Sequence, residues 1–430
     1  MSPGHAVVIG RGVIGCAVAL ELARDGWAVT SVDRHAAAGH GSTSGSSGVI
    51  RTFYSSRMGT ALAWEGLHGW RDWAGHVDLP PGTPLAPYRE TGMLVLATEG
   101  NDRLAAQRAA SDDLGIPWDW WDADALRDRT PFLDLTRYGP ARRPEDEGFG
   151  EPTGGTLREA VFWPGGGYVS DPMLAAQNLW HAAARAGAVA VTGEIAGIRA
   201  DDRVRAVVLS DGAEVAGDVV VNVAGPGSRR INALAGVLDD MAVTTAPMRQ
   251  EVVHLPGPPG VDYGAAGLPM SDDDAGVYSR PERGGVLVGT QEPACDPLDW
   301  VEDERAVDRA FTAQWDVQAM RMAQRIPTLP LPRQASGVVE LYDVSTDWIP
   351  IYDRSSLDGF FMACGTSGNQ FKCAPIAGRL MAEVIRHVWE EGDQDADPVQ
   401  VRAPRTGVTL DTGFWSRRRT GAATSGSVLG

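Results

Sequence analysis

The sequence predicts a mixed α/β fold with two different kinds of sheet. Residues 5–32 have the pattern of an apolar strand, a glycine-rich turn, a helix and a second apolar strand. That order is expected in a parallel sheet covered by helices. Two later apolar runs, at 219–224 and 360–364, also end in glycine-rich turns. Residues 236–335 instead carry Pro-Gly pairs and short alternating runs, which are typical of antiparallel strands.

Composition argues against several classes of function. The chain has 430 residues, 43% of them hydrophobic and 22% charged, with a net charge of -18. These values are typical of a globular protein of two or three domains. Nucleic acids and anionic membranes bind basic surfaces, so neither is expected as the main partner. No apolar run is long enough for a transmembrane helix, and we expect no cleaved signal peptide, since the N-terminus lacks a basic start.

The cysteines give no sign of a metal site or a disulfide framework. Cys16, Cys295, Cys364 and Cys373 form no CxxC pair and adjoin no histidine cluster. A chain of this size with so few cysteines is typical of a reducing compartment, so the cytoplasm is the expected location.

The first glycine turn has the spacing of a dinucleotide-binding motif. A GxGxxG pattern, Gly10–Gly15, follows the first strand and opens the helix, and Asp33 ends the next strand. In this pattern the glycines allow a tight turn, a close approach of pyrophosphate and close helix–strand packing. The helix N-terminus attracts phosphate, while an acid at position 33 accepts hydrogen bonds from a ribose and disfavours NADP. The alternative is a tight turn without a ligand.

A segment of small residues follows Asp33. Residues 39–48 are almost all Gly, Ser and Thr, and they run into Val49–Arg51 and an aromatic helical stretch. The composition also fits a flexible linker, but no new domain begins after it. Such a loop can pass closely under a second phosphate and a flat ring, as two-dinucleotide-binding flavoproteins require.

Capping and turn signals predict further elements. Asp171 and Pro172 predict the start of a helix that ends near residue 186. The remaining predictions are strands over 189–191, 195–199, 204–209, 219–225 and 249–255, a hairpin over 276–289, and helices over 303–326 and from about 375 to 388. From about residue 416 onward the chain is rich in Arg, Ser and Gly, which predicts disorder.

One residue type is almost missing from the chain. Lys and Arg total 38, and Lys372 is the only lysine. Codon bias explains the many arginines but not the one retained lysine, for which chance is the alternative. Lys372 ends a glycine-rich turn, Gly365–Lys372, between an apolar run and a helix with Pro375 in its first turn.

These segments together resemble the flavoproteins of the D-amino-acid oxidase (DAO) family, in particular the glycine oxidase and monomeric sarcosine oxidase branch. The resemblance is carried by Val8–Gly15 with Asp33, by Gly45–Arg51, by Val219–Gly225 and by Gly365–Lys372. It covers most of the chain.

The resemblance implies a division into domains. A two-dinucleotide-binding, Rossmann-like FAD domain is expected over 1–85, 151–235 and 336–400. An antiparallel-sheet substrate domain is expected over 86–150 and 236–335, and 401–430 is expected to be a C-terminal tail.

The resemblance also implies FAD as the cofactor, bound non-covalently, because Glu340 stands where sarcosine oxidases carry the flavin-linking cysteine. The helix start after Lys372 would stabilise negative charge on the reduced ring. The residues expected to hold FAD are Gly10, Gly12, Val13, Ile14, Gly15, Asp33, Arg34, Ser42, Thr43, Ser44, Ser47, Gly48, Ile195, Ala224, Gly225, Gly365, Gly368, Asn369, Gln370, Phe371 and Lys372.

Arg51 and Lys372 occupy positions at which the sarcosine-oxidase pattern binds a substrate carboxylate. Arginine offers a two-pronged fork and lysine a point charge; for Arg51 the alternative is a surface cation. The other candidate contacts are Tyr54, Tyr278 and Tyr342 as pocket walls, with core packing as the alternative for each, and Arg280 for a second acidic group.

The expected reaction is oxidation of the C–N bond of an N-substituted glycine or related secondary amino acid. Hydride would pass from the carbon next to nitrogen to flavin N5, the imine would hydrolyse, and O₂ would reoxidise the flavin. In this reaction the cofactor carries out the chemistry and the protein orients the substrate.

Three departures from the family pattern leave alternatives open. The lysine that activates oxygen in sarcosine oxidases would fall near Leu287, Gln291 replaces an active-site histidine, and the glycine-oxidase arginine near Leu341 and Tyr342 is absent. A dehydrogenase with a carrier protein or quinone as acceptor is the first alternative. The others are a flavin-binding protein without turnover and an FAD-dependent RNA-modifying enzyme, which the acidic net charge opposes.

Overall fold

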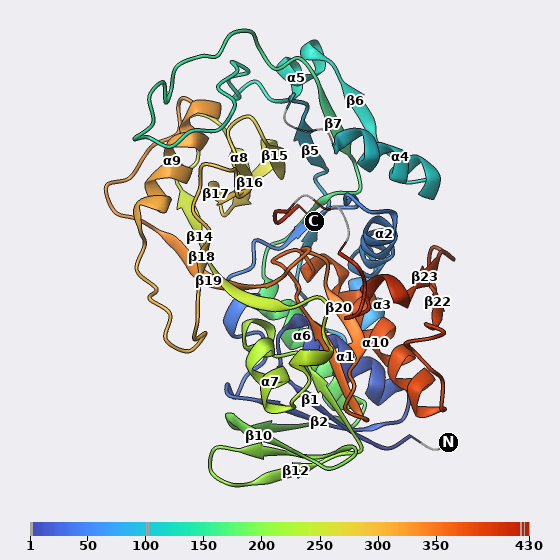
Figure 1. Ribbon diagram of the computed structural model, residues 1–430. Helices are drawn as coiled ribbons and strands as arrows, with labels where there is room; N and C mark the ends of the chain where they lie inside the picture. The colour runs from blue at the N-terminus through green and yellow to red at the C-terminus, as the bar shows by residue number, and fades with distance from the viewer. Residues whose placement is uncertain (1–2, 100, 102, 422–423, 425, 430) are drawn as a thin grey trace.

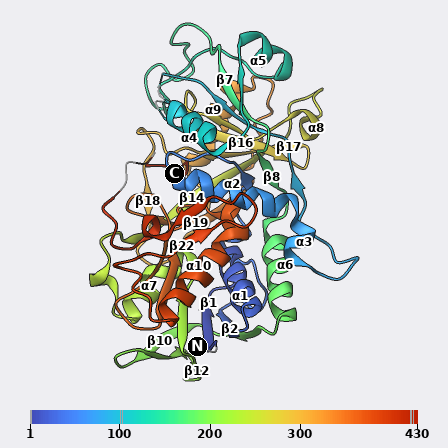
Figure 2. The same ribbon diagram turned by 90° about the vertical axis from the view of Figure 1, so that its right-hand side faces the viewer.

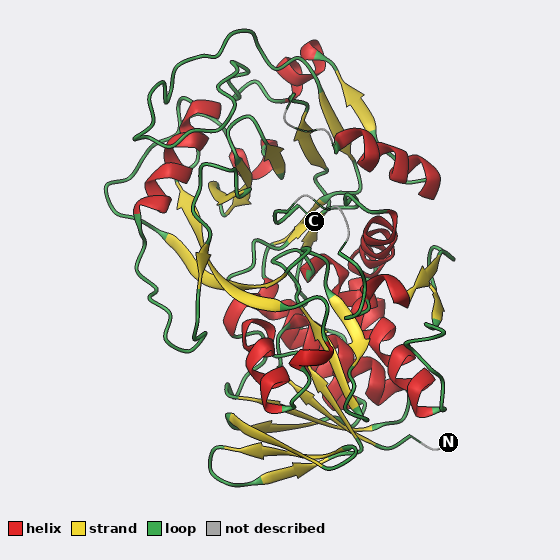
Figure 3. Ribbon diagram, viewed as in Figure 1, coloured by secondary structure: helices red, strands yellow, loops and turns green. Residues whose placement is uncertain are grey.

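The computed structural model describes residues 3–99, 101, 103–421, 424 and 426–429. Within these residues the strands form two large sheets, placed one above the other in Figures 1 and 2, with most of the helical mass around the lower sheet (Figure 3). One sheet is mainly parallel and the other mainly antiparallel. The mixed α/β fold that the sequence predicts is therefore confirmed.

The lower sheet is the parallel one. In the described chain its six strands have the order β20-β21-β13-β1-β2-β9, and only β20 and β21 pair in antiparallel fashion. Helices α1, α6 and α10 cover one of its faces. The bounds are β1 (His5–Ile9), β2 (Ala28–Asp33), β9 (Val189–Thr192), β13 (Val219–Asn222), β20 (Ile351–Arg354), β21 (Phe360–Cys364), α1 (Val13–Arg24), α6 (Pro172–Arg185) and α10 (Ala374–Trp389).

Strand β1 shows how this sheet is buried on both faces. Ala6 and Val8 belong to the core that the helices share, whereas Val7 and Ile9 belong to a second core under a small sheet. That sheet consists of β10 (Ile195–Ala200), β11 (Val204–Leu209) and β12 (Glu214–Ala216). Since neighbouring residues of a strand face opposite sides, a strand covered on both faces is apolar throughout.

The upper sheet has nine strands in the described chain, and all neighbours are antiparallel except β15 and β5. Helix α9 (Ala313–Arg325) packs on it through Trp315 and Met322. The strands are β5 (Met93–Leu96), β6 (Asp119–Trp121), β7 (Ala160–Trp163), β14 (Thr245–Leu255), β15 (Met270–Asp272), β16 (Val277–Glu282), β17 (Gly285–Thr290), β18 (Asp299–Trp300) and β19 (Gly337–Ser345).

Smaller elements complete the described structure. Strand β8 (Gly167–Val169) pairs with both β3 (Val49–Ile50) and β4 (Tyr88–Arg89), and β22 (Gln400–Arg402) pairs with β23 (Thr409–Asp411). The other helices are α2 (Arg57–Arg71), α3 (Trp73–Val77), α4 (Leu104–Leu114), α5 (Ala123–Arg129), α7 (Ser228–Leu234) and α8 (Tyr263–Ala266).

Two long strands connect the sheets. Strands β14 and β19 pair along their length and extend from the upper part of the molecule towards the lower sheet (Figure 1). The predicted domain bounds remain a prediction, but two strands differ from them. Strands β7 and β19 fall in segments assigned to the FAD domain, yet both pair within the upper sheet. Strand pairing between distant segments leaves no local signal in a sequence.

Two predictions about the second half of the chain are wrong. The helix predicted over 303–326 begins only at Ala313, because Thr312 caps it by accepting from the Gln314 amide and the preceding residues form a loop. Residues 416–421 are not disordered, since Arg417 is completely buried among three carboxylates. The predicted disorder of residues 422–423, 425 and 430 lies outside the described residues.

The helices differ from membrane spans. Among the residues that the structure describes, every helix is too short or too polar to pass through a lipid bilayer.

The buried ion pairs of Arg417 predict a large contribution to stability. Its guanidinium lies 2.9 Å from Asp353 and 2.7 Å from Asp395, and removing one partner of a buried pair costs about 3–5 kcal/mol. Arg417→Met is therefore expected to lower the denaturant midpoint strongly. Arg418→Met is the matched control, because the exposed Arg418 also pairs with Asp240 and Asp395 but should contribute at most about 1 kcal/mol. Equal midpoints for the two variants would contradict the anchoring role.

Candidate active site

The turn between β1 and α1 can be formed only by glycine at two positions. Gly10 has a φ of 111°, and a Cβ atom there would lie 2.4 Å from the Val223 carbonyl oxygen. A Cβ atom on Gly15 would lie 2.1 Å from the Gly10 carbonyl oxygen. Both contacts are with backbone, which cannot move away. The first residues of α1 are thereby held against the ends of β1 and β13.

The N-terminus of α1 is open for an anion. The N-cap residue, Gly12, has no side chain with which to cap the helix. The amide of the first helical residue, Val13, instead donates to the hydroxyl of Thr43 over 3.1 Å. A Cβ atom on Gly12 would lie 3.1 Å from that hydroxyl, so it would narrow the space between the helix and the 41–48 loop. Helix N-terminal amides and the helix dipole favour phosphate. The space that glycine leaves here therefore fits the pyrophosphate of FAD.

Asp33 is held in place at the end of β2. Its two carboxylate oxygens accept from the Arg11 and His35 amides, each over 2.7 Å. These contacts leave lone pairs on both oxygens that can accept ribose hydroxyls. The donor and acceptor set thus fits the adenosine end of the cofactor.

Two cavities meet beside these residues. The first has a volume of about 1310 Å³ and the second of about 920 Å³, including space open to solvent. They have Gly12, Thr43 and Gly225 in common, so they form one elongated space. Predicted FAD residues that line the second cavity are Gly10, Gly12, Asp33, Arg34, Ser42, Thr43, Ile195, Ala224 and Gly225.

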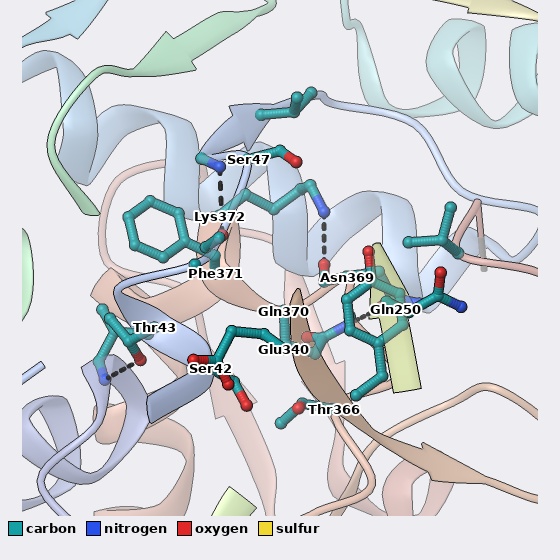
Figure 4. Close-up of a pocket in the computed structure, with 18 of the residues that line it drawn as sticks. Ser42, Thr43, Ser47, Gln250, Glu340, Thr366, Asn369, Gln370, Phe371 and Lys372 are labelled. Atoms are coloured by element: carbon teal, nitrogen blue, oxygen red, sulfur yellow. Dashed lines mark hydrogen bonds between the residues drawn. The ribbon is translucent and has the colours of Figure 1, made fainter. Parts of the chain in front are cut away.

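The first cavity contains most of the other predicted residues (Figure 4). The glycine-rich turn after β21 forms one wall, and the serine-rich loop lies next to it. Predicted residues that line this cavity are Gly12, Val13, Ile14, Gly15, Ser42, Thr43, Ser47, Gly48, Arg51, Gly225, Tyr278, Tyr342, Gly368, Asn369, Gln370, Phe371 and Lys372.

Arg51 and Lys372 lie close together in this cavity. Their side chains approach the ring of Tyr54, with the Arg51 Cζ 4.0 Å and the Lys372 Nζ 5.2 Å from its centroid. Lys372 Nζ donates to the Tyr54 hydroxyl over 3.1 Å. It also donates to the Asn369 carbonyl, a bond marked in Figure 4. Arg51 donates to three backbone carbonyls, those of Phe53, Val428 and Leu429.

Among the described residues, neither cation has an acidic partner. Both residues are buried, with 3% and 4% of their surface exposed, and within the described ranges no carboxylate forms an ion pair with either. Burial lowers the pKa of Arg51, and burial together with the charge of Arg51 lowers the pKa of Lys372 well below its usual value. Two adjacent buried cations create a strong demand for an anion.

Two tyrosines form walls of the first cavity. The Tyr278 hydroxyl lies 2.7 Å from Ser47 Oγ. The ring of Tyr342 packs on Gly368, where a Cβ atom would come within 2.4 Å of it. None of the four cysteines lines either cavity, and Glu340 does, consistent with non-covalent FAD.

Four predicted residues are not brought to the cavity walls. Tyr54 lies behind the cavity wall, where its ring contacts the side chains of Arg51 and Lys372. The amide N–H of Gly365 donates to the Asp343 carboxylate. Ser44 is exposed and donates to the Gly41 carbonyl. Arg280 was predicted to meet a second acidic group, but its guanidinium pairs with Glu282 and lies over the Tyr168 ring. That arginine is therefore already neutralised within its own strand.

The structure adds residues that the sequence did not indicate. Gln250 and Asp343 line the first cavity, and burial raises the pKa of Asp343 to about 7. Val428 and Leu429, from the last described part of the chain, also line it. Glu292 lies behind Val428, whose amide donates to it over 3.0 Å. In the sequence, only the departure from the family pattern at the neighbouring Gln291 points to this region.

We expect a methyl group added at Gly12, the N-cap residue of α1, to weaken FAD binding. Gly12→Ala is expected to raise the dissociation constant of FAD at least about tenfold, since the new Cβ fills the phosphate space. Reconstitution of the apoprotein, followed by flavin fluorescence, measures this constant. Gly197→Ala is the control, because its Cβ would meet only Val208, at an ordinary 3.7 Å. Unchanged FAD affinity in Gly12→Ala would contradict the assignment.

Known structures share the fold. L-proline dehydrogenase from P. horikoshii superposes with a TM-score of 0.74 at 19% identity, covering 97% of each chain. Glycine oxidase from Geobacillus kaustophilus superposes with a TM-score of 0.70 at 22% identity, covering 91% of this chain and 96% of that one.

Curated relatives extend the likeness to sequence. Mouse (Mus musculus) peroxisomal sarcosine oxidase is 26% identical over an alignment of 394 positions that covers 88% of this chain and 91% of that protein. The tRNA 5-methylaminomethyl-2-thiouridine biosynthesis bifunctional protein MnmC of Ralstonia nicotianae is 34% identical over 140 residues. That match covers 29% of this chain and only 19% of the relative's length.

The family comparison covers most of the chain. The model of the DAO family, described as FAD dependent oxidoreductase, matches residues 5–384. This range contains both arms of the candidate site, from the first glycine turn to Lys372. The chain therefore belongs to the DAO family of FAD-dependent oxidoreductases.

Proposed function

We propose that this flavoprotein oxidises the C–N bond of a small amine that carries a carboxylate, and that the substrate is an N-substituted glycine or another secondary amino acid. The observation that carries the proposal is the buried pair of Arg51 and Lys372 in the first cavity. Both cations face a space that is continuous with the proposed FAD site.

A carboxylate is the anion that suits this pair. One guanidinium nitrogen of Arg51 already donates to the carbonyl oxygens of Val428 and Leu429, the shorter bond being 2.6 Å. The oxygens of a substrate carboxylate can take the positions of these two carbonyl oxygens. Lys372 adds a second positive charge, which a neutral carbonyl does not balance. Charge-assisted hydrogen bonds are stronger than neutral ones. A carboxylate therefore binds here more strongly than an amide or an alcohol would.

The residues of this chain orient the substrate and exclude water. The carboxylate fixes one end of the amino acid, while Tyr278 and Tyr342 enclose the rest of the cavity. The N-terminus of α10, directly after Lys372, adds a positive dipole to the same wall. Bound FAD would supply the hydride acceptor, and the resulting imine hydrolyses in water to a carbonyl compound and a shorter amine.

The relatives support this substrate class without identifying one compound. Sarcosine oxidase, glycine oxidase and L-proline dehydrogenase are names of enzymes whose substrates carry a carboxylate and an amine. The partial likeness to MnmC raises RNA modification as an alternative. The net charge of -18 opposes it, because RNA binding depends on basic surfaces.

Oxygen is the electron acceptor that we propose, with a dehydrogenase as second candidate. The resemblance to sarcosine oxidases aligns their oxygen-activating lysine near Leu287 of this chain. Leu287 packs in an apolar cluster with Tyr278. That observation favours another acceptor, since Lys372 is the only lysine in the sequence. For location we propose the cytoplasm, in keeping with four free cysteines.

The cation pair predicts selective loss of substrate binding. Arg51→Met is expected to raise the dissociation constant of acetate about 10- to 150-fold, the equivalent of about 1.5–3 kcal/mol. FAD affinity should stay within about threefold of wild type. Titration of the bound flavin's absorbance measures the first constant. Arg57→Met, which removes an exposed arginine of α2, serves as control. Parallel loss of FAD and acetate binding would refute the assignment.

The proposed reaction predicts flavin bleaching by particular amines. Under anaerobic conditions, N-methylglycine, proline and other secondary amino acids are expected to reduce the bound FAD, whereas the corresponding amides should not, because they lack the carboxylate. Absorbance in the visible flavin bands follows the reduction. A protein whose flavin stays oxidised with the whole panel would be a binder without this activity.

Reoxidation of the reduced protein separates the two candidate acceptors. If O₂ is the acceptor, air restores the oxidised spectrum within the turnover time and one H₂O₂ forms per substrate oxidised. If restoration needs an added quinone or dye, the protein is a dehydrogenase and the proposal of O₂ fails.

A further inference from the structure

The backbone of Val428 is held like an amino acid in the first cavity. Its amide donates to Glu292 Oε2 over 3.0 Å, and its carbonyl accepts from Arg51 Nη2 over 3.2 Å. One nitrogen, one α-carbon and one carboxyl-type carbon thus lie between a carboxylate and a guanidinium. An α-amino acid has the same three atoms in the same order.

The side chain and the neighbours of Val428 extend this likeness. Val428 is 9% exposed and packs in an apolar cluster with Met248, Tyr278 and Leu287. Its nitrogen carries a carbon substituent, the carbonyl carbon of Ser427, as the nitrogen of an N-alkyl amino acid does. Figure 1 shows the red C-terminal part of the chain entering the middle of the molecule near the label C.

We propose that Glu292 binds the nitrogen of an N-substituted α-amino acid whose carboxylate is bound by Arg51 and Lys372, and that Val428 covers this subsite until the substrate displaces it. This inference rests on the proposed function, and it names the group that distinguishes an amino acid from a plain carboxylate. It also explains why Glu292 itself lies behind the tail rather than on the cavity wall.

The surroundings of Glu292 hold its carboxylate in one orientation. Gln250 Nε2 donates to its Oε1 over 3.2 Å, which leaves Oε2 for the nitrogen now supplied by Val428. The residue has a φ of 50°, a left-handed conformation that is unfavourable for glutamate and is often retained at functional sites. The two oxygens thus have different partners, and only one of them depends on the tail.

The charged and titratable groups around Glu292 make it a weak acid. Burial, and to a smaller extent Asp296 on the same loop, raise the pKa of Glu292 to about 8, although the Val428 amide and Gln250 favour its ionised form. Tyr278 from β16 and Tyr342 from β19 also face its charge, and both phenols have raised pKa values, so they stay neutral.

A carboxylate of this kind can accept the proton that the substrate must lose. An amino acid arrives as an ammonium ion, and its nitrogen lone pair becomes free when the N–H bond breaks and the proton forms an O–H bond with Glu292. The carboxylate becomes a neutral carboxylic acid and the ammonium becomes a neutral amine. The N–H bonding pair stays on nitrogen as its lone pair, so the step involves no oxidation or reduction. Hydride loss from the α-carbon of the neutral amine then follows.

The first test compares Glu292→Gln with wild type in the anaerobic reduction of bound FAD. The probe is whichever of N-methylglycine, N-methylalanine and proline reduces wild type fastest. The second-order rate constant of wild type should rise with pH through about 8, as Glu292 ionises. In Glu292→Gln it should be at least about tenfold lower at neutral pH, and its rise should move up to the ammonium pKa of the probe.

Three readouts separate this role from a structural one. Glu292→Gln should keep its FAD content and should bind acetate, which has no nitrogen, no more weakly than wild type does. Glu302→Gln, which alters an exposed glutamate of the same region, should match wild type throughout. A pH profile of Glu292→Gln that coincides with the wild-type profile overturns the inference. Failure of all probes with wild type would instead count against the proposed function.

The second test concerns the tail. Val428→Pro removes the amide that donates to Glu292, so the tail should cover the subsite for a smaller fraction of the time. The apparent dissociation constant of acetate should then fall at least about threefold, since it depends on the fraction of uncovered protein. An unchanged constant for acetate, with FAD content intact, overturns the covering role of Val428.

Discussion

The chemistry of the candidate site depends on two basic side chains that are buried side by side. Arg51 and Lys372 share the ring of Tyr54 and have only carbonyls and a phenol as described partners. A pair of this kind is unfavourable unless the surrounding structure holds it in place and a ligand neutralises it. The first condition is met by the fold, and the second defines the chemistry of the site.

The fold brings these cations together from opposite ends of the chain. Arg51 follows β3, which is paired with β8, and Lys372 follows the turn after β21 of the parallel sheet. Helix α2 fastens the two segments, because Gly66 lets it approach the Lys372 carbonyl so closely that a Cβ atom would lie 2.5 Å away. The indole of Trp70 donates to that same carbonyl over 2.8 Å. Rigid backbone, rather than an ion pair, therefore positions the lysine.

Much of this site could be predicted from the sequence, because its signals are local. The turn at Gly10–Gly15, the acid at position 33 and the turn ending in Lys372 each combine residue type with fixed spacing, and the structure brings most of them to one elongated space. The role of Arg280 towards a second acidic group stays a prediction, but a local signal in the sequence counts against it. Glu282 is two residues away, on the same face of a strand, and neutralises it.

The parts that were missed depend on contacts between distant segments. Gln250 on β14 and Glu292 after β17 meet only because these strands pair in the upper sheet, and Val428 reaches them from the far end of the chain. No spacing in the sequence reports such a meeting. Arg417 likewise has a fixed position because it pairs with Asp240, Asp353 and Asp395, which come from distant segments. The composition around Arg417 nevertheless resembles that of a disordered tail.

A crystal structure of the FAD-bound protein in complex with acetate tests the central claim most directly. The account predicts the acetate carboxylate between the Arg51 guanidinium and the Lys372 ammonium, within hydrogen-bond distance of both, in the place that the carbonyl oxygens of residues 428 and 429 take in this structure. Acetate bound elsewhere, with Arg51 still bonded to those carbonyls and Lys372 without an anion, would contradict it.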